Sequence, residues 1–249
     1  MKKNKYLLLA ILAILAISTC YASQALAAVS LDRTRIIFNS EQKSVSLTIT
    51  NKNDQLPYLA QGWIENEQGK KVSTPFATLP PIQRLEPNKS SQLRIEALPE
   101  IKNLPQDRES LYYFNLREIP PKSDKPNVLQ LALQSKIKLF YRPAAIELTN
   151  AEKINNPWQN KLILLKKENN YIIDNPTPFF ITIVGATNSN GQRVSNEFES
   201  VMAQPFKTIP LGLTVDKLGN NPKLIYINDY GGRVELDFYC ENNKCSTKK

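Results

Sequence analysis

The chain has 249 residues, of which 41% are hydrophobic and 22% charged, and its 32 lysines and arginines outnumber 23 acidic residues for a net charge of +9. This composition excludes a disordered or collagen-like chain and predicts a folded protein of one large or two ordinary domains. The chain contains no histidine, which excludes Ser-His-Asp and Cys-His catalysis and any imidazole metal site.

Residues 1–27 have the pattern of a cleaved secretory signal peptide. Three lysines precede an apolar run over residues 6–17, and the small-residue exit Ala25-Leu26-Ala27 follows. The apolar run is shorter than the roughly 20 residues needed to span a membrane. We therefore expect an exported mature chain that starts at Ala28, whose net charge falls to +6 because three lysines are removed.

The first mature segment, residues 28–38, is an apolar strand interrupted by charges. Arg33 and Arg35 share one face because side chains alternate along a strand. This pattern is typical of a charged edge that discourages aggregation. It also fits an anion site, in which a guanidinium pairs with a carboxylate such as a peptide C-terminus and a nearby lysine adds a point charge. Both interpretations stay open on the pattern alone.

Short runs of alternating apolar and polar residues follow one another along the chain, as in residues 44–50 and 129–134. This period of two predicts half-buried strands. Turn-forming residues separate the runs, and no long helical-period window interrupts them. We therefore predict an all-β protein with antiparallel sandwiches or barrels. The mature chain is about twice as long as one immunoglobulin-like sandwich of roughly 100 residues, so we expect two such domains.

The strand expected over residues 127–140 has a leucine at every second position near its start. Leu129, Leu131 and Leu133 lie on one face, and Lys138 lies on the opposite face. This is typical of an ordinary core strand with one solvated face. The same pattern fits an exposed edge strand that offers an apolar ladder to another chain, which is β-strand addition. Periodicity does not separate the two interpretations.

A domain boundary is expected after the strand that ends near Tyr141. Arg142-Pro143 interrupts strand pairing, and a polar stretch follows it. Proline fixes its φ angle, so this link should be a stiff elbow that holds two domains at a defined angle with a cleft between them. We assign residues 28–146 to an N-terminal domain and residues 147–249 to a C-terminal domain.

Two cysteines remain in the mature chain, Cys240 and Cys245, and export places them in an oxidising compartment. We expect a local disulfide that staples a terminal hairpin. Two thiols without histidine or two further cysteines do not make a structural zinc site, so we expect no metal and no other cofactor.

A longer motif resembles a known family. Residues 107–121, Asp-Arg-Glu-Ser-Leu-Tyr-Tyr-Phe-Asn-Leu-Arg-Glu-Ile-Pro-Pro, are similar to the signature of the periplasmic pilus-assembly chaperones. The resemblance extends over essentially the whole mature chain. Further similar segments are residues 28–35, 55–61, 134–145, 175–178 and 226–233, together with the pair Cys240 and Cys245.

The resemblance implies two immunoglobulin-like β-sandwich domains arranged as a boomerang. It also implies a periplasmic chaperone that lends a missing strand to pilus subunits (pilins and the adhesin), caps them without ATP and delivers them to an outer-membrane usher. Leu129, Leu131 and Leu133 correspond to the donated ladder, and Arg35 and Lys138 correspond to the anchor of the subunit's C-terminal carboxylate. Unliganded protein is expected to self-associate through the same strand.

Three further positions match the family at the domain junction. Glu109, Arg142 and Asp229 resemble an interdomain charge network that holds the angle between the domains. The alternative is that the same residues form exposed ion pairs, each worth about 0–1 kcal/mol. The loop over residues 120–127 is short, which resembles the subgroup that assembles rigid, composite pili.

Other functions fit less well. A charge of +6 on an exported chain does not favour nucleic acid as a partner. Closely spaced carboxylates, such as Glu65 with Glu67 or Glu197 with Glu199, come without a nucleophile or metal ligand, so we expect no enzyme. The main alternative is a secreted pilin or adhesin subunit of the same assembly system. Two complete domains, the leucine ladder and the pair Arg35 and Lys138 favour the chaperone.

Overall fold

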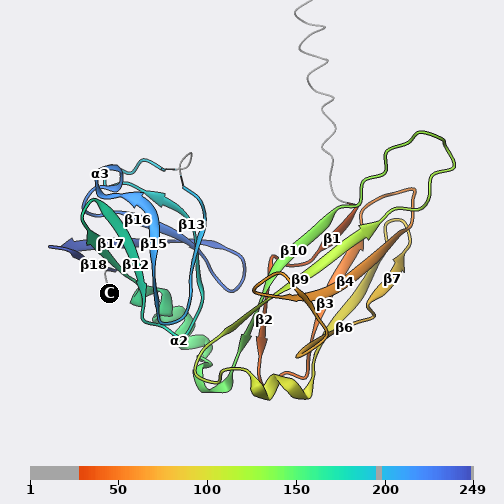
Figure 1. Cartoon of the computed structure of the whole chain (residues 1–249), viewed down its shortest axis with the longest axis horizontal. Coiled ribbons are helices and arrows are strands. Elements are labelled where there is room, and N and C mark those ends of the chain that lie inside the picture. Colours follow the sequence, from red (N-terminus) through yellow and green to blue (C-terminus); the bar gives the residue numbers. More distant parts are fainter. Residues whose placement is uncertain (1–27, 195–197, 248–249) are drawn as a thin grey trace, which may run out of the picture.

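The structure is a computed structural model that describes residues 28–194 and 198–247. The signal peptide expected over residues 1–27 lies outside the described residues. The chain forms two β domains set at an angle, joined by a short connection after β10 (Figure 1). Within the described part, no helix is long and apolar enough to cross a membrane.

The N-terminal domain is a sandwich of two sheets. In β3, Leu47 and Ile49 are buried while Ser46 is exposed, as the alternating sequence predicts. The core between the sheets includes Phe38 and Phe114. The first sheet has the order β1 (Val29–Leu31), β3 (Ser44–Asn51), β8 (Ser90–Ala97) and β6 (Phe76–Leu79). The second has the order β2 (Arg35–Asn39), β10 (Gln134–Arg142), β9 (Ser110–Ile119), β4 (Tyr58–Asn66) and β5 (Lys71–Val72), with β7 (Ile82–Leu85) paired to β4 and η1 (Pro99–Asn103) before β9.

The C-terminal domain has its own core, which includes Tyr171, Ile183, Leu224 and Phe238. Its strands follow the hydrogen-bonded order β14 (Val201–Ala203), β13 (Ile181–Thr187), β16 (Lys223–Ile227), β17 (Arg233–Glu241), β18 (Lys244–Thr247), β11 (Ile163–Lys167), β12 (Asn170–Asn175) and β15 (Lys207–Thr214). The short helices are η2 (Ala144–Ile146), α2 (Asn150–Asn155), η3 (Trp158–Lys161) and α3 (Val215–Leu218).

The predicted all-β fold with two β domains is confirmed by these strands and by the two separate cores. The predicted disulfide is also present. Cys240 and Cys245 face each other across the β17–β18 hairpin and are bonded, so the bridge staples the last hairpin of the chain. The boundary between residues 146 and 147 stays a prediction; Ile146 and Leu148, on either side of it, both pack against the C-terminal core.

The strand expected over residues 127–140 is shorter than predicted, since β10 begins only at Gln134. The β9–β10 ladder pairs Gln134 with Arg117, so its continuation would set Leu131 opposite Pro120. Proline has no N–H to donate, and two consecutive prolines end the ladder there. The three leucines therefore precede β10 in an irregular segment. This segment is tied to β9 where the Glu118 N–H donates to the Leu133 carbonyl at 3.0 Å. Farther along, β10 is an interior strand between β2 and β9.

Candidate functional site

The centre of the site is the parallel pairing of β2 with β10, which sets Arg35 directly beside Lys138. Paired residues in neighbouring strands project from the same face of a sheet. Odd-numbered residues of β10, such as Leu139, enter the N-terminal core, so Lys138 projects from the other face. That face meets the C-terminal domain, because the ring of Phe140 lies 5.7 Å from that of Phe180. Two cations from distant parts of the sequence are thus held at the junction.

Arg35 is only partly satisfied by the protein. Its Nη1 donates to the Ile227 carbonyl at 3.1 Å, across the domain junction. Its Nε is buried and has no hydrogen-bond partner among the described residues. Burial lowers the pKa of Arg35, while the charges of Asp229 and Glu109 oppose that shift. A buried guanidinium N–H without an acceptor is costly, so the position favours an incoming anion.

Lys138 lies in a similar environment. Its Nζ donates to the Thr182 hydroxyl of β13 at 2.9 Å, a neutral partner from the other domain. Burial, together with the neighbouring charge of Arg35, lowers the pKa of Lys138 to about 8. Neither Lys138 nor Arg35 forms a salt bridge with a described carboxylate. The pair therefore has the chemistry of a carboxylate anchor: two adjacent cationic donors that no salt bridge to a described residue occupies.

The three leucines lie upstream of this pair on the same segment of chain. Their exposed fractions are 82% for Leu129, 66% for Leu131 and 44% for Leu133. A row of large, exposed apolar side chains is typical of an interaction surface, whereas single exposed apolar residues are common on any protein. Lys138 lies five positions after Leu133, a length of about 17 Å in an extended strand. The ladder and the cation pair are thus placed at the two ends of one potential pairing edge.

Glu109, Arg142 and Asp229 meet at the domain junction. Arg142 is 1% exposed and Glu109 is 3% exposed. Arg142 Nε and Nη2 donate to Glu109 Oε1 at 2.9 and 2.7 Å, and its Nη1 donates to Asp229 Oδ2 at 2.8 Å. The Arg142 guanidinium also lies about 5 Å from the ring centroids of Trp158 and Phe179. These are buried contacts and not the exposed ion pairs that the sequence left as an alternative.

Each carboxylate of this network is shared between the domains. Glu109, at the end of the loop before β9, accepts at Oε2 from the Phe180 N–H of the C-terminal domain at 2.8 Å. Burial raises the pKa of Glu109, while the charge of Arg142 and the Phe180 N–H oppose the shift. Burial would lower the pKa of Arg142, but the charges and hydrogen bonds of Glu109 and Asp229 raise it. Separation of the domains would leave these groups unpaired.

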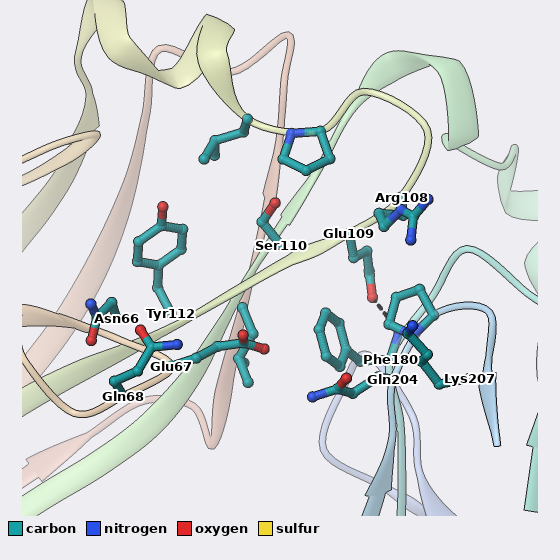
Figure 2. A pocket seen from close by; sticks show the side chains of 14 residues that line it. Asn66, Glu67, Gln68, Arg108, Glu109, Ser110, Tyr112, Phe180, Gln204 and Lys207 are labelled. Atoms are coloured by element: carbon teal, nitrogen blue, oxygen red, sulfur yellow. Dashed lines mark hydrogen bonds between the residues drawn. The ribbon is translucent and has the colours of Figure 1, made fainter. Parts of the chain in front are cut away.

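A hollow of about 440 Å³ lies beside this network, between the start of β9 and the C-terminal domain (Figure 2). Glu109 borders it at the hydrogen bond to the Phe180 backbone, and Arg108, Tyr112 and Lys207 form other parts of its wall. The hollow lies outside the contacts of Arg35 and Lys138, and no residue predicted from the sequence except Glu109 lines it.

Four contact residues of the junction were missed in the sequence. Ile227 and Phe180 make their hydrogen bonds to Arg35 and Glu109 through backbone groups, so these hydrogen bonds leave no side-chain signal, although the Phe180 ring also lies near that of Phe140. Thr182 is one of many threonines in the strands. The contact of Thr34 is visible only in the folded structure, where its Oγ1 lies so close to Gly231 that a Cβ at position 231 would clash with it. Gly231 has a φ of +83°, so glycine is required there both for space and for conformation.

Comparison with known proteins gives two family matches that together span most of the described chain. Residues 28–147 match the family model for the pili and flagellar-assembly chaperone, PapD N-terminal domain, and residues 157–238 match the pili assembly chaperone PapD, C-terminal domain. The chain is 54% identical over 225 residues to chaperone protein PapD of Escherichia coli, which covers 90% of this chain and 91% of that one.

Solved structures agree with these matches. The Escherichia coli chaperone DraB aligns with a TM-score of 0.69 and 30% identity, over 86% of this chain and 96% of that one. A chain from the complex of the Salmonella enterica SafA pilin with the SafB chaperone aligns with a TM-score of 0.69 and 27% identity, over 88% of this chain and 99% of that one.

Proposed function

Because the chain belongs to the PapD family of pilus-assembly chaperones, we propose that it works in the periplasm by strand donation to a pilus subunit whose C-terminal carboxylate it anchors. Leu129, Leu131 and Leu133 enter an apolar groove of the subunit, and Arg35 with Lys138 bind the carboxylate. The family matches do not support the alternative of a pilin or adhesin subunit, since both domains match chaperone models.

The observation that carries the proposal is the placement of an exposed apolar ladder on the same segment as Lys138, which β2 sets beside Arg35, with neither cation in a salt bridge to a described residue. The carboxylate fixes where the subunit strand ends, and the leucines then face its groove at every second residue. A slip of one residue would turn every leucine away from the groove. Each buried leucine contributes roughly 1.5–3 kcal/mol before ordering costs. The ladder thus supplies affinity and the anchor supplies register.

The irregular state of the ladder before binding fits this role. Pro120 and Pro121 stop β9 from pairing with the leucines, so the edge groups of residues 129–132 are left for another chain. The solved complex of the SafA pilin with the SafB chaperone supports a pilin as the partner. We further propose delivery of the subunit to an outer-membrane usher, and self-association through the same leucines when no subunit is bound.

Leu131→Glu is expected to abolish subunit binding without unfolding the chaperone. A carboxylate at the centre of the ladder would have to be buried in the apolar groove, which costs far more than the lost leucine contact. Leu131 is exposed in the free protein, so thermal unfolding should be unchanged. The measurement is recovery of soluble chaperone–pilin complex from cells that express both proteins.

Ala132→Glu is the matched control for this variant. Ala132 is the exposed neighbour of Leu131 and lies on the opposite face of an extended strand. We expect Ala132→Glu to keep most of the complex. If the two variants lost the complex equally, or if neither did, the alternating insertion of leucines would be wrong.

Binding should also weaken as the pH rises through about 8. The pKa of Lys138 is lowered to about 8 in the free protein, so its charge is present below that pH and is lost above it. A carboxylate ligand requires the charged form, and the peptide carboxylate itself stays ionised throughout this range. We expect affinity for a pilin C-terminal peptide to fall about tenfold or more between pH 7 and pH 9.5, as measured by calorimetry.

Lys138→Arg provides the control for the pH profile. Arginine keeps its charge over the whole range, so the variant should bind with an affinity that hardly changes with pH. A decline in the variant as steep as in the wild-type protein would assign the titration to another group and contradict the role of Lys138.

A further inference from the structure

A second hollow, of about 380 Å³, lies on the β2 side of the junction and is built by both domains. The N-terminal domain supplies Arg35 and the turn before β2, and the C-terminal domain supplies Lys153 of α2 and the turn that carries Asp229 and Tyr230. The turn between β16 and β17 reaches toward the N-terminal domain (Figure 1). The hollow shares Arg35 with the carboxylate anchor, but Lys138 does not line it.

The charges of this hollow do not balance. Asp32 is paired with Arg33 at 2.9 Å, and Asp229 is paired with Arg142 at 2.8 Å. Four cationic side chains line the hollow against these two carboxylates, and the charge of Asp229 also acts on Arg35. Arg35 and Lys153 remain, and neither forms a salt bridge with a described carboxylate. If Arg35 binds the terminal carboxylate of a subunit together with Lys138, Lys153 is left as a second cation a short way along the cleft.

The backbone of Lys153 is held in place by the fold of α2. The Thr149 side chain accepts from the Glu152 N–H at 3.2 Å, and the Glu152 carboxylate accepts from the Thr149 N–H at 2.8 Å, which completes a capping box. Leu148, just before the helix, packs against the C-terminal core. Lys153 itself is partly buried, and no hydrogen bond of its side chain to a described residue is present. A lysine on a fixed helix, with no salt bridge to a described residue, is a good partner for an acidic group.

Tyr230 stands beside the hollow and is 87% exposed. The turn that carries it is rigid: the Asn228 side chain accepts from the N–H groups of Tyr230 and Gly232 at 3.1 and 2.8 Å. Close packing of Gly231 on Thr34 also fixes this turn against the N-terminal domain. An exposed aromatic ring on a fixed turn, lining the same hollow as Lys153, has the character of a protein-binding surface, in which tyrosine is enriched.

We propose that this hollow is a second contact for the bound pilus subunit, in which Lys153 pairs with an acidic side chain near the subunit's C-terminus and Tyr230 packs beside it. The inference rests on the proposed function, because the anchored carboxylate is what brings the subunit's last residues to the cleft. It assigns Lys153 a role in selection among subunits, since an acidic residue at the matching position is attracted and a basic one is repelled.

The test is a double-mutant cycle at low ionic strength, where exposed charge pairs are least screened. The probes are peptides with the C-terminal strand sequence of a pilin, each carrying Glu or Gln at one of the last few positions before the terminal residue. We expect one position at which Glu binds wild-type protein about 3–10-fold more tightly than Gln. The preference should vanish in Lys153→Gln and reverse in Lys153→Glu. Lys167→Gln, an exposed lysine of the same domain, should leave it unchanged.

Two results would overturn the inference while the proposed function stands. The first is a Glu preference that is the same in wild-type protein and in Lys153→Gln at every position. The second is a loss of binding in Lys153→Gln only for peptides with a free C-terminal carboxylate, which would make Lys153 part of the anchor. If amidation of the C-terminus has no effect on wild-type binding, the anchor fails, and this inference fails with it.

Discussion

Arg142→Ala is expected to lower the free energy of unfolding by about 3–5 kcal/mol, because removal of one partner leaves the buried carboxylate of Glu109 uncompensated. Arg142 is among the largest fully buried side chains of the described residues, and it donates to carboxylates from both domains. The loss should appear in urea unfolding followed by tryptophan fluorescence, since Trp158 lies beside the Arg142 guanidinium.

A double variant separates the charge network from simple packing. Arg142→Met with Glu109→Gln removes both buried charges while it keeps most of the volume. This protein should be more stable than Arg142→Ala, because the fully buried carboxylate of Glu109 is no longer left unpaired and only Asp229, whose side chain is 19% exposed, loses its partner. If Arg142→Ala cost less than about 1 kcal/mol, the three residues would behave as exposed ion pairs and would not hold the domains together.

Lys138→Met is expected to weaken binding of a pilin C-terminal peptide by about 10–100-fold, as measured by calorimetry at pH 7. A charge-assisted hydrogen bond contributes about 1.5–3 kcal/mol, and the variant removes one of the two anchor donors. The fold should survive, because the variant replaces a cation beside Arg35 with an apolar side chain of similar length. Arg35→Ala should weaken binding by a comparable factor.

Lys136→Met is the matched control for the anchor. Lys136 lies two residues from Lys138 on the same face of β10, but its Nζ is paired with Glu65 at 2.7 Å. Its charge is thus already compensated, and we expect less than a threefold change in binding. A similar loss in both variants would indicate a general effect of positive charge and would remove Lys138 from its specific role.

The period-two alternation in the sequence was sufficient to predict the β architecture. Leu47 and Ile49 of β3 point into the core as their spacing indicates. The bridge between Cys240 and Cys245 followed from export and the cysteine count. The strand that begins at Gln134 was predicted to begin at residue 127. The pattern of leucines is local, whereas strand pairing depends on the opposite strand, where Pro120 and Pro121 have no N–H to donate.

The site depended on information that local patterns do not contain. Arg35 and Lys138 are about a hundred residues apart, and only the parallel pairing of β2 with β10 sets them side by side. Their pairing was expected from the family resemblance and not from periodicity. The contacts through the backbone of Phe180 and Ile227 have no side-chain signature at all. One readable signal was overlooked: Thr149 and Glu152 have the spacing of a capping box, which marks the start of α2.

The most direct test of strand donation with a carboxylate anchor compares two peptides and two proteins. A peptide with the C-terminal strand of a pilin is prepared as the free acid and as the amide, and each is titrated into wild-type protein and into Lys138→Met. We predict that amidation weakens binding to the wild-type protein by at least tenfold and changes binding to Lys138→Met much less, since the two changes remove the same interaction. An equal loss on amidation in both proteins, or no loss in the wild-type protein, would contradict the anchor.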